Sequence, residues 1–202
     1  MVMTLQKPDN EACSYDERSE DFGYMVETAS ELDLPDGFSA EVFGGNIVVS
    51  PWSRGSYFRP MNSLLNQLEP HAPESHVTSG APFKFVFPNH AAAVGPDVWV
   101  ADEDMIEIDS SKLPGEALSL VAELTSPSTR GRDLTTKADL YGHAGVPVYL
   151  LFDMKEQRCT VYSEPSSRYG YQSLVAVEFG KPVQVPEPFG FELDTSAFKR
   201  QR

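Results

Sequence analysis

The longest apolar runs of the chain predict two strands that are buried on both faces of a sheet. Residues 118–124 (LSLVAEL) are apolar except for Ser119 and Glu123, and residues 148–153 (VYLLFD) are apolar up to the final Asp153. Runs of this kind, without the alternation of a half-exposed strand, are typical of central strands. We therefore expect these two segments to form the middle of the fold.

Two helices are predicted from apolar positions that recur three and four residues apart. The apolar face of residues 57–68 consists of Phe58, Met61, Leu64, Leu65 and Leu68. Pro70 and Pro73 end this helix, because proline cannot continue a helical hydrogen-bond ladder. The second helix runs from Leu134 to about His143, with Asp133 as its N-cap, and it is stopped by Gly145 and Pro147.

The remaining strands are short. They are a hairpin of residues 40–43 and 47–49 around the turn Gly44-Gly45-Asn46, strands at 83–87 and 97–100, and peripheral strands at 160–162 and 174–177. The order of these elements predicts one α/β domain with a mixed central sheet flanked by helices: a hairpin, a helix, strands, a helix and a further strand. This domain is expected to span residues 38–202.

Residues 1–37 differ from the rest of the chain in charge. They carry ten acidic and two basic residues, a net charge of −8 out of −14 for the whole protein. They contain few β-branched residues and show no sustained periodicity, so we predict a flexible acidic arm with one short helix around residues 24–32.

Composition narrows the classes of protein to which the chain can belong. No apolar run approaches the roughly 20 residues needed to cross a bilayer, and no secretory segment opens the chain, so we expect a cytoplasmic protein without a membrane partner. Cys13 and Cys159 are far apart and are predicted to be free thiols, and the four histidines lack zinc-site spacing. The excess of acidic residues opposes phosphate binding, although much of this negative charge belongs to the arm.

Two acids stand where strands begin or end. Asp97 opens one predicted strand and Glu123 lies near the end of another, so neighbouring strands would bring both carboxylates to one rim of the sheet. Such a pair suits magnesium, which prefers carboxylate oxygens and retains waters. Alternatively, Asp97 stabilises a turn and Glu123 is a strand-end charge. For Asp97 alone the turn is favoured, whereas Glu123 sits in an apolar run and requires a partner or a cation to offset its desolvation.

Lys137 adds a cation to this pair. It shares a helix face with Leu134, Ala138 and Tyr141, so its side chain falls beside the stripe that should meet the sheet. It either extends along that stripe into solvent or points at the carboxylates, where it would stabilise charge on a phosphate.

Several motifs resemble the Uma-two family of proposed endonucleases, which belongs to the PD-(D/E)xK restriction-endonuclease-like superfamily. They are GPDV at 95–98, VAELTSPST at 121–129, RDL at 132–134 with Lys137 and Tyr141, GVPVY at 145–149 with Asp153, and EVFGGNIV at 41–48. The similarity covers about residues 38–198. It implies a metal-dependent phosphodiesterase core in which Asp97 and Glu123 hold the cation, Glu41 adds a third acid and Lys137 is the lysine.

The chain departs from the family pattern at two places. Thr125 stands two residues after Glu123, where the superfamily motif usually has its lysine, and residues 52–58 lack the histidine that family members often show. The leading hypothesis is a Mg²⁺-dependent endonuclease, with Mn²⁺ as a substitute, that hydrolyses phosphodiester bonds of nucleic acid, DNA rather than RNA. The competing hypothesis is a catalytically degenerate binding or regulatory module. A homodimer is compatible with both.

Overall fold

The computed structural model describes residues 3–5 and 15–199, and these form a mixed α/β fold. Its central sheet has six strands in the order β12-β11-β10-β9-β7-β4. Their bounds are β4 His76–Ser79, β7 Val98–Asp102, β9 Leu118–Leu124, β10 Val148–Asp153, β11 Arg158–Ser163 and β12 Ser173–Glu178. Only β9 and β10 are parallel, so the sheet is mixed. The predicted fold class, including the two fully buried central strands, is confirmed.

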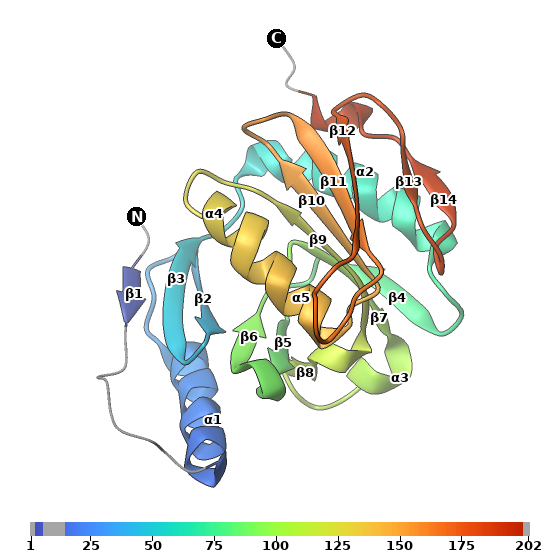
Figure 1. Cartoon of the computed structure of the whole chain (residues 1–202). Helices are drawn as coiled ribbons and strands as arrows, with labels where there is room; N and C mark the ends of the chain where they lie inside the picture. Colours follow the sequence, from blue (N-terminus) through green and yellow to red (C-terminus); the bar gives the residue numbers. More distant parts are fainter. Residues whose placement is uncertain (1–2, 6–14, 200–202) are drawn as a thin grey trace.

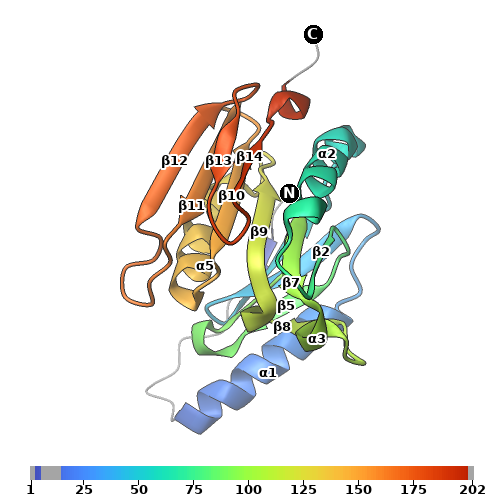
Figure 2. The ribbon, with the colours of Figure 1, turned by 90° about the vertical axis from the view of Figure 1, so that its right-hand side faces the viewer.

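Helices cover both faces of the central sheet (Figures 1 and 2). On one face, α2 (Phe58–Leu68) buries Leu64 and Leu68 against even-numbered residues of β7, β9 and β10, and the hairpin of β13 (Val183–Val185) and β14 (Phe191–Leu193) adds to this core. On the other face, α5 (Ala138–Ala144) packs on odd-numbered residues of the same strands. Alternate residues of a strand point to opposite faces, so Glu123 faces α5.

A second six-stranded sheet, in the order β1-β3-β2-β6-β5-β8, lies beside the first. Its strands are β1 Met3–Leu5, β2 Phe38–Phe43, β3 Asn46–Pro51, β5 Lys84–Phe87, β6 Ala92–Val94 and β8 Lys112–Pro114. The predicted hairpin is present as β2 and β3, but it belongs to this second sheet and not to the central one. Consequently, Glu41 approaches the central sheet from a separate layer.

The N-terminal segment is more ordered than the predicted flexible arm. Helix α1 runs from Tyr15 to Glu31, and its Val26 and Ala29 are each only 4% exposed because they pack on β2 and β3. The apolar residues recur at helical spacing at positions 22, 25, 26, 29 and 32, but the acidic residues between them conceal the pattern. Residues 1–2 and 6–14 of the predicted arm, with Cys13, lie outside the described residues. Cys159 is a buried free thiol.

Burial of α1 leads to a stability prediction. Val26→Asp is expected to lower the free energy of unfolding by roughly 2–4 kcal/mol, because it places an unpaired charge in an apolar cluster. Tyr24→Asp introduces the same charge in the same helix at a side chain that is 72% exposed, and should change stability by only about 0.5 kcal/mol. Denaturant unfolding of both variants measures the difference. Equal, small losses would mean that α1 contributes little to the core.

The segment after β9 is one helical stretch with an irregular middle. It consists of α4 (Arg130–Arg132), a π-helical turn η5 (Asp133–Lys137) and α5, and Gly145 ends it in the left-handed region at φ 86°. Asp133 is therefore inside the helix and is not its N-cap, contrary to the sequence-based expectation. One further helical turn, α3 (Glu103–Ile106), follows β7 directly. Short 3₁₀ turns occur at Gly55–Tyr57, Glu69–His71, Pro88–His90, Gly115–Ala117 and Ser196–Phe198.

Among the described residues, no helix has the length and apolar character required to span a bilayer.

Candidate active site

Glu123 lies near the end of β9, in the middle of the central sheet, and its side chain faces the helical stretch. It is 4% exposed. Its Oε1 accepts hydrogen bonds from Lys137 Nζ at 2.8 Å and from the Tyr141 hydroxyl at 3.2 Å. The acid in the apolar run therefore has the partners that its burial requires.

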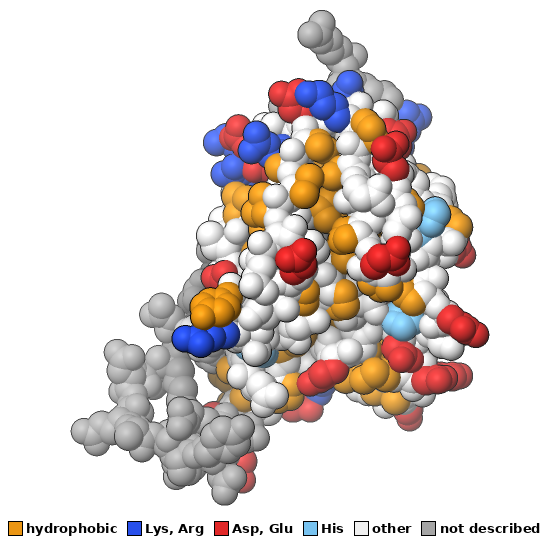
Figure 3. Space-filling model, turned by 45° about the vertical axis from the view of Figure 1, so that its right-hand side comes forward, with side chains coloured by type: hydrophobic (Ala, Val, Ile, Leu, Met, Phe, Trp, Pro, Cys, Tyr) orange, Lys and Arg blue, Asp and Glu red, His pale blue; other side chains and the backbone are white. Residues whose placement is uncertain are grey.

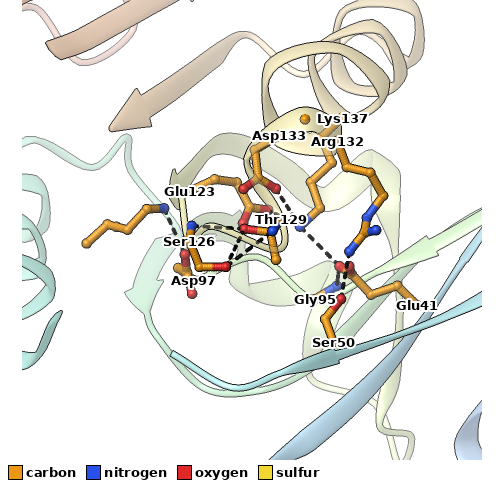
Figure 4. A network of polar contacts seen from close by, with 12 residues as sticks. Glu41, Ser50, Gly95, Asp97, Glu123, Ser126, Thr129, Arg132, Asp133 and Lys137 are labelled. Carbon is orange, nitrogen blue, oxygen red and sulfur yellow. Dashed lines mark hydrogen bonds and ion pairs between the residues drawn. The ribbon is translucent and has the colours of Figure 1, made fainter. Parts of the chain in front are cut away.

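Lys137 is the last residue of the π-helical turn and is also only 4% exposed. Besides Glu123, its Nζ lies 3.1 Å from Glu41 Oε1 and 3.7 Å from Asp133 Oδ1 (Figure 4). Of the two placements considered from the sequence, the ammonium group adopts the one among the carboxylates, and it does not extend into solvent. A single cation thus faces acids from three separate elements.

Asp97 lies just before β7 and joins this cluster through the backbone of β9. Its Oδ2 accepts a hydrogen bond from Leu124 N at 2.8 Å, and its Oδ1 accepts one from the Ser53 hydroxyl at 2.8 Å. Leu124 directly follows Glu123, so the two acids lie at the same rim of the sheet. The carboxylate of Asp97 connects separate parts of the chain, and these contacts are not those of a local turn after Pro96.

Glu41 approaches from β2 in the second sheet and is 7% exposed. Its Oε1 accepts a hydrogen bond from Gly95 N at 3.1 Å in addition to its ion pair with Lys137. Glu41 therefore links the second sheet and the segment before β7 to the helical stretch, and the four residues predicted from sequence are brought together.

Sequence reasoning missed the role of Asp133, which is 1% exposed. Its position four residues before Lys137 places both side chains on one helix face, and this spacing was the available signal. Arg132 donates from Nη2 to the Ser50 hydroxyl at 2.6 Å, and its buried Nε has no hydrogen-bond partner among the described residues.

Arg130, at the start of the same helical stretch, pairs with Asp153. Arg130 Nη2 lies 2.6 Å from Asp153 Oδ2, and Arg130 Nε donates to the same carboxylate at 3.0 Å. Burial alone would raise the pKa of Asp153, but these hydrogen bonds hold it below its usual value. The pair ties the start of the helical stretch to the end of β10, next to the site.

The cluster holds more negative than positive charge. Burial raises the pKa of Glu123 well above its ordinary value, with attraction to Lys137 opposing the shift and repulsion from the neighbouring acids adding to it. Burial also raises the pKa of Asp97 and of Asp133. For Lys137, burial alone would lower the pKa, but the carboxylates, Glu123 first among them, raise it well above its usual value. Lys137 is therefore protonated, and the acids around it favour a further proton or cation.

These residues line a cavity of about 580 Å³ at the rim of the central sheet. Its lining includes Glu41, Asp97, Glu123 and Lys137, together with residues 50–54 at the end of β3 and just beyond it, and residues 126–129 after β9. The cavity therefore gives Glu41, Asp97 and Glu123 access to a ligand.

A family model described as "Putative restriction endonuclease", Uma2, matches residues 26–196. The chain belongs to the Uma2 family. The resemblance inferred from sequence motifs is thereby confirmed. The Uma2 match begins within α1, at the buried residue Val26. A solved structure described as a "putative nuclease belonging to DUF820" from Anabaena variabilis superposes with a TM-score of 0.65 at 18% sequence identity, covering 86% of this chain and 96% of that one. This likeness supports the fold. No curated protein matches the chain.

The donor set of this Uma2 protein is suited to a hard cation. Magnesium is commonly bound through one or two carboxylates and keeps several waters, and Asp97 and Glu123 supply two such groups. In the described part of the chain, no group of three or more His, Cys, Asp or Glu side chains forms a ligand set. Asp133 Oδ1 is also buried and accepts no hydrogen bond from the described residues.

Proposed function

We propose that this Uma2 protein is a metal-dependent endonuclease that hydrolyses phosphodiester bonds of DNA, with Mg²⁺ or Mn²⁺ as its cofactor. The observation that carries the proposal is the ammonium of Lys137, held 2.8 Å from Glu123 and 3.1 Å from Glu41 on the floor of a cavity that Asp97 also lines. The family description favours a nuclease, and restriction endonucleases act on DNA.

Each residue has a distinct part in the proposed reaction. Asp97 and Glu123 would hold the cation, which when bound supplies positive charge to a phosphate and acidifies a water. Lys137 has three N–H donors, of which Glu123 and Glu41 accept two at short distance. We assign the third to a phosphate oxygen, where a fixed positive charge stabilises the negative charge that develops in the transition state.

Glu41 and Tyr141 are positioning residues in this scheme. Glu41 is fixed by Gly95 N and in turn fixes Lys137, and the Tyr141 hydroxyl donates to the same oxygen of Glu123 that Lys137 contacts. Burial and the nearby acids raise the pKa of Tyr141 well above its usual value, so its hydroxyl keeps its proton and acts as a donor.

A binding module of the same fold is the second candidate. It is favoured by the net charge of −14, by the absence of histidine from residues 52–58 and by the lack of a three-residue ligand set among the described residues. On this hypothesis the buried cluster holds the two sheets together and performs no turnover.

An assay that combines cleavage with metal binding separates the two candidates. We expect Mg²⁺ or Mn²⁺ at about 100 times its Kd to stabilise the protein by about 2.7 kcal/mol, which raises Tm by roughly 5–10 °C for a domain of this size. DNA should be cleaved in the presence of metal and remain intact with EDTA. If the protein shows neither a metal-dependent Tm shift nor cleavage of DNA or RNA, the enzyme is rejected in favour of the binding module.

A further inference from the structure

An exposed tryptophan lies at the opening of the cavity. Trp52 lines the cavity and is 62% exposed, and no ring or cation of the described residues stacks on its indole. Large apolar side chains that are this exposed and line a concave site are typical of binding surfaces. The second tryptophan, Trp99, is in contrast 2% exposed in the core.

The chain around Trp52 is anchored to the proposed site. The backbone N–H of Trp52 donates to Gly37 O at 2.8 Å, and the next residue, Ser53, donates its hydroxyl hydrogen bond to Asp97. The backbone of Trp52 is therefore fixed, and the residue next to it contacts Asp97, a proposed metal ligand. Phe83 lines the same cavity, and its ring is supported by Trp99 at a centroid distance of 6.0 Å.

The charges of the cavity are balanced and offer few phosphate contacts. Arg54, Lys84 and Lys137 line it together with Glu41, Asp97 and Glu123. On the face shown in Figure 3, Lys and Arg side chains form separate small groups, and Asp and Glu side chains are scattered among hydrophobic and uncharged ones. Proteins that hold a duplex mainly through its backbone neutralise several phosphates, and this cavity lacks the basic residues to do so.

Base stacking is the source of affinity that remains. An aromatic side chain that stacks on a nucleic-acid base contributes about 1–3 kcal/mol, independently of sequence. Bases inside a duplex already stack on their neighbours on both faces, whereas an unpaired base has a face available. Glu123 and Lys137 are each only 4% exposed beneath the cavity, so the strand must enter it, and a flexible single strand can do so more easily than a stiff duplex.

We propose that the cavity takes an unpaired nucleotide, whose base stacks on Trp52 while the adjoining phosphodiester lies over Glu123 and Lys137. The inference rests on the proposed nuclease function and specifies its substrate class as single-stranded segments of nucleic acid. Stacking does not distinguish the sugar, so DNA and RNA strands are both tested.

Binding is measured without metal, so that cleavage does not interfere. A 12-nucleotide DNA strand, the RNA strand of the same sequence and the blunt DNA duplex are titrated while tryptophan fluorescence is recorded. We expect at least one single strand to quench the emission in a saturable manner and to bind about tenfold or more tightly than the duplex. Trp52→Ala should remove the quenching, because the remaining Trp99 is buried, and should weaken binding of a labelled strand by roughly tenfold or more.

Two further variants serve as controls. Trp52→Phe retains an aromatic face and should recover part of the affinity, whereas Tyr169→Ala removes an aromatic side chain that is 65% exposed and lies outside the cavity, and should bind like the parent protein. Equal binding of strand and duplex, or equal binding by Trp52→Ala and the parent, overturns the stacking proposal. Strand binding through Trp52 without any cleavage after metal addition supports stacking but rejects the nuclease.

Discussion

Replacing Lys137 with methionine is expected to reduce DNA cleavage by roughly 10²–10³-fold, because the transition state would lose a charged donor that is fixed in place. Methionine has a similar length, so the helical stretch can keep its packing against the sheet. The Tm shift caused by Mg²⁺ should persist, because Lys137 is not assigned as a ligand. Single-turnover cleavage and thermal unfolding, each with and without Mg²⁺, measure the two responses.

The same substitution should destabilise the metal-free protein in a pH-dependent way. Removing one partner of a buried ion pair typically costs about 3–5 kcal/mol, because the remaining charges are left without compensation. The pKa values of Asp97, Glu123 and Asp133 are raised by burial, so the folded state binds more protons than the unfolded chain. The free energy of unfolding therefore falls as pH rises from the unfolded carboxyl pKa of about 4 through the raised folded values. We expect the loss in Lys137→Met to be smaller at pH 5 than at pH 8.

A surface ion pair provides the matched control for this variant. Lys181 is 64% exposed and lies 3.2 Å from Glu178, so Lys181→Met removes the same charge from a solvated pair. It should leave cleavage unchanged and alter stability by less than about 1 kcal/mol. Cleavage by Lys137→Met at the parent rate would show that the ammonium has no part in the reaction.

The centre of the fold and its buried acid could be predicted from local sequence. The runs that become β9 and β10 are apolar because both faces of these strands are covered, and an acid in such a run requires a partner. The 3.6-residue spacing placed Lys137 on the inner face of its helix. These inferences succeeded because each depends on neighbours within a few residues along the chain.

Features that depend on contacts between residues far apart in the sequence could not be predicted in this way. Glu41 entered the predicted site only through family resemblance, since nothing in β2 indicates that it meets Lys137 from another sheet. Asp133 was interpreted as an N-cap because it follows a polar loop, whereas the helix in fact begins three residues earlier, at Arg130. For α1, the strong acidity of the segment concealed an apolar stripe that packs on β2 and β3.

Replacing Glu123 with glutamine is expected to separate metal binding from folding. The substitution keeps the shape of the side chain, and its amide oxygen can still accept hydrogen bonds from Lys137 and Tyr141. It removes one of the three acids that pair with Lys137, while Glu41 and Asp133 still neutralise the ammonium. The metal-free variant should therefore be as stable as the parent protein or more stable, because like-charge repulsion falls.

Loss of this carboxylate should nevertheless abolish the response of the protein to metal. A neutral amide is a weak ligand for a hard cation, and Asp97 alone, already bonded to Leu124 N and Ser53, is not expected to hold Mg²⁺. Cleavage should fall by roughly 10³-fold or more, and the Tm shift with Mg²⁺ should disappear. Glu178→Gln makes the same change at a glutamate that is 74% exposed, and should preserve both properties. A Glu123→Gln protein that retains the full metal-induced shift would place the cation elsewhere, whereas a large loss of stability without metal would mean that the charge of Glu123 serves the fold.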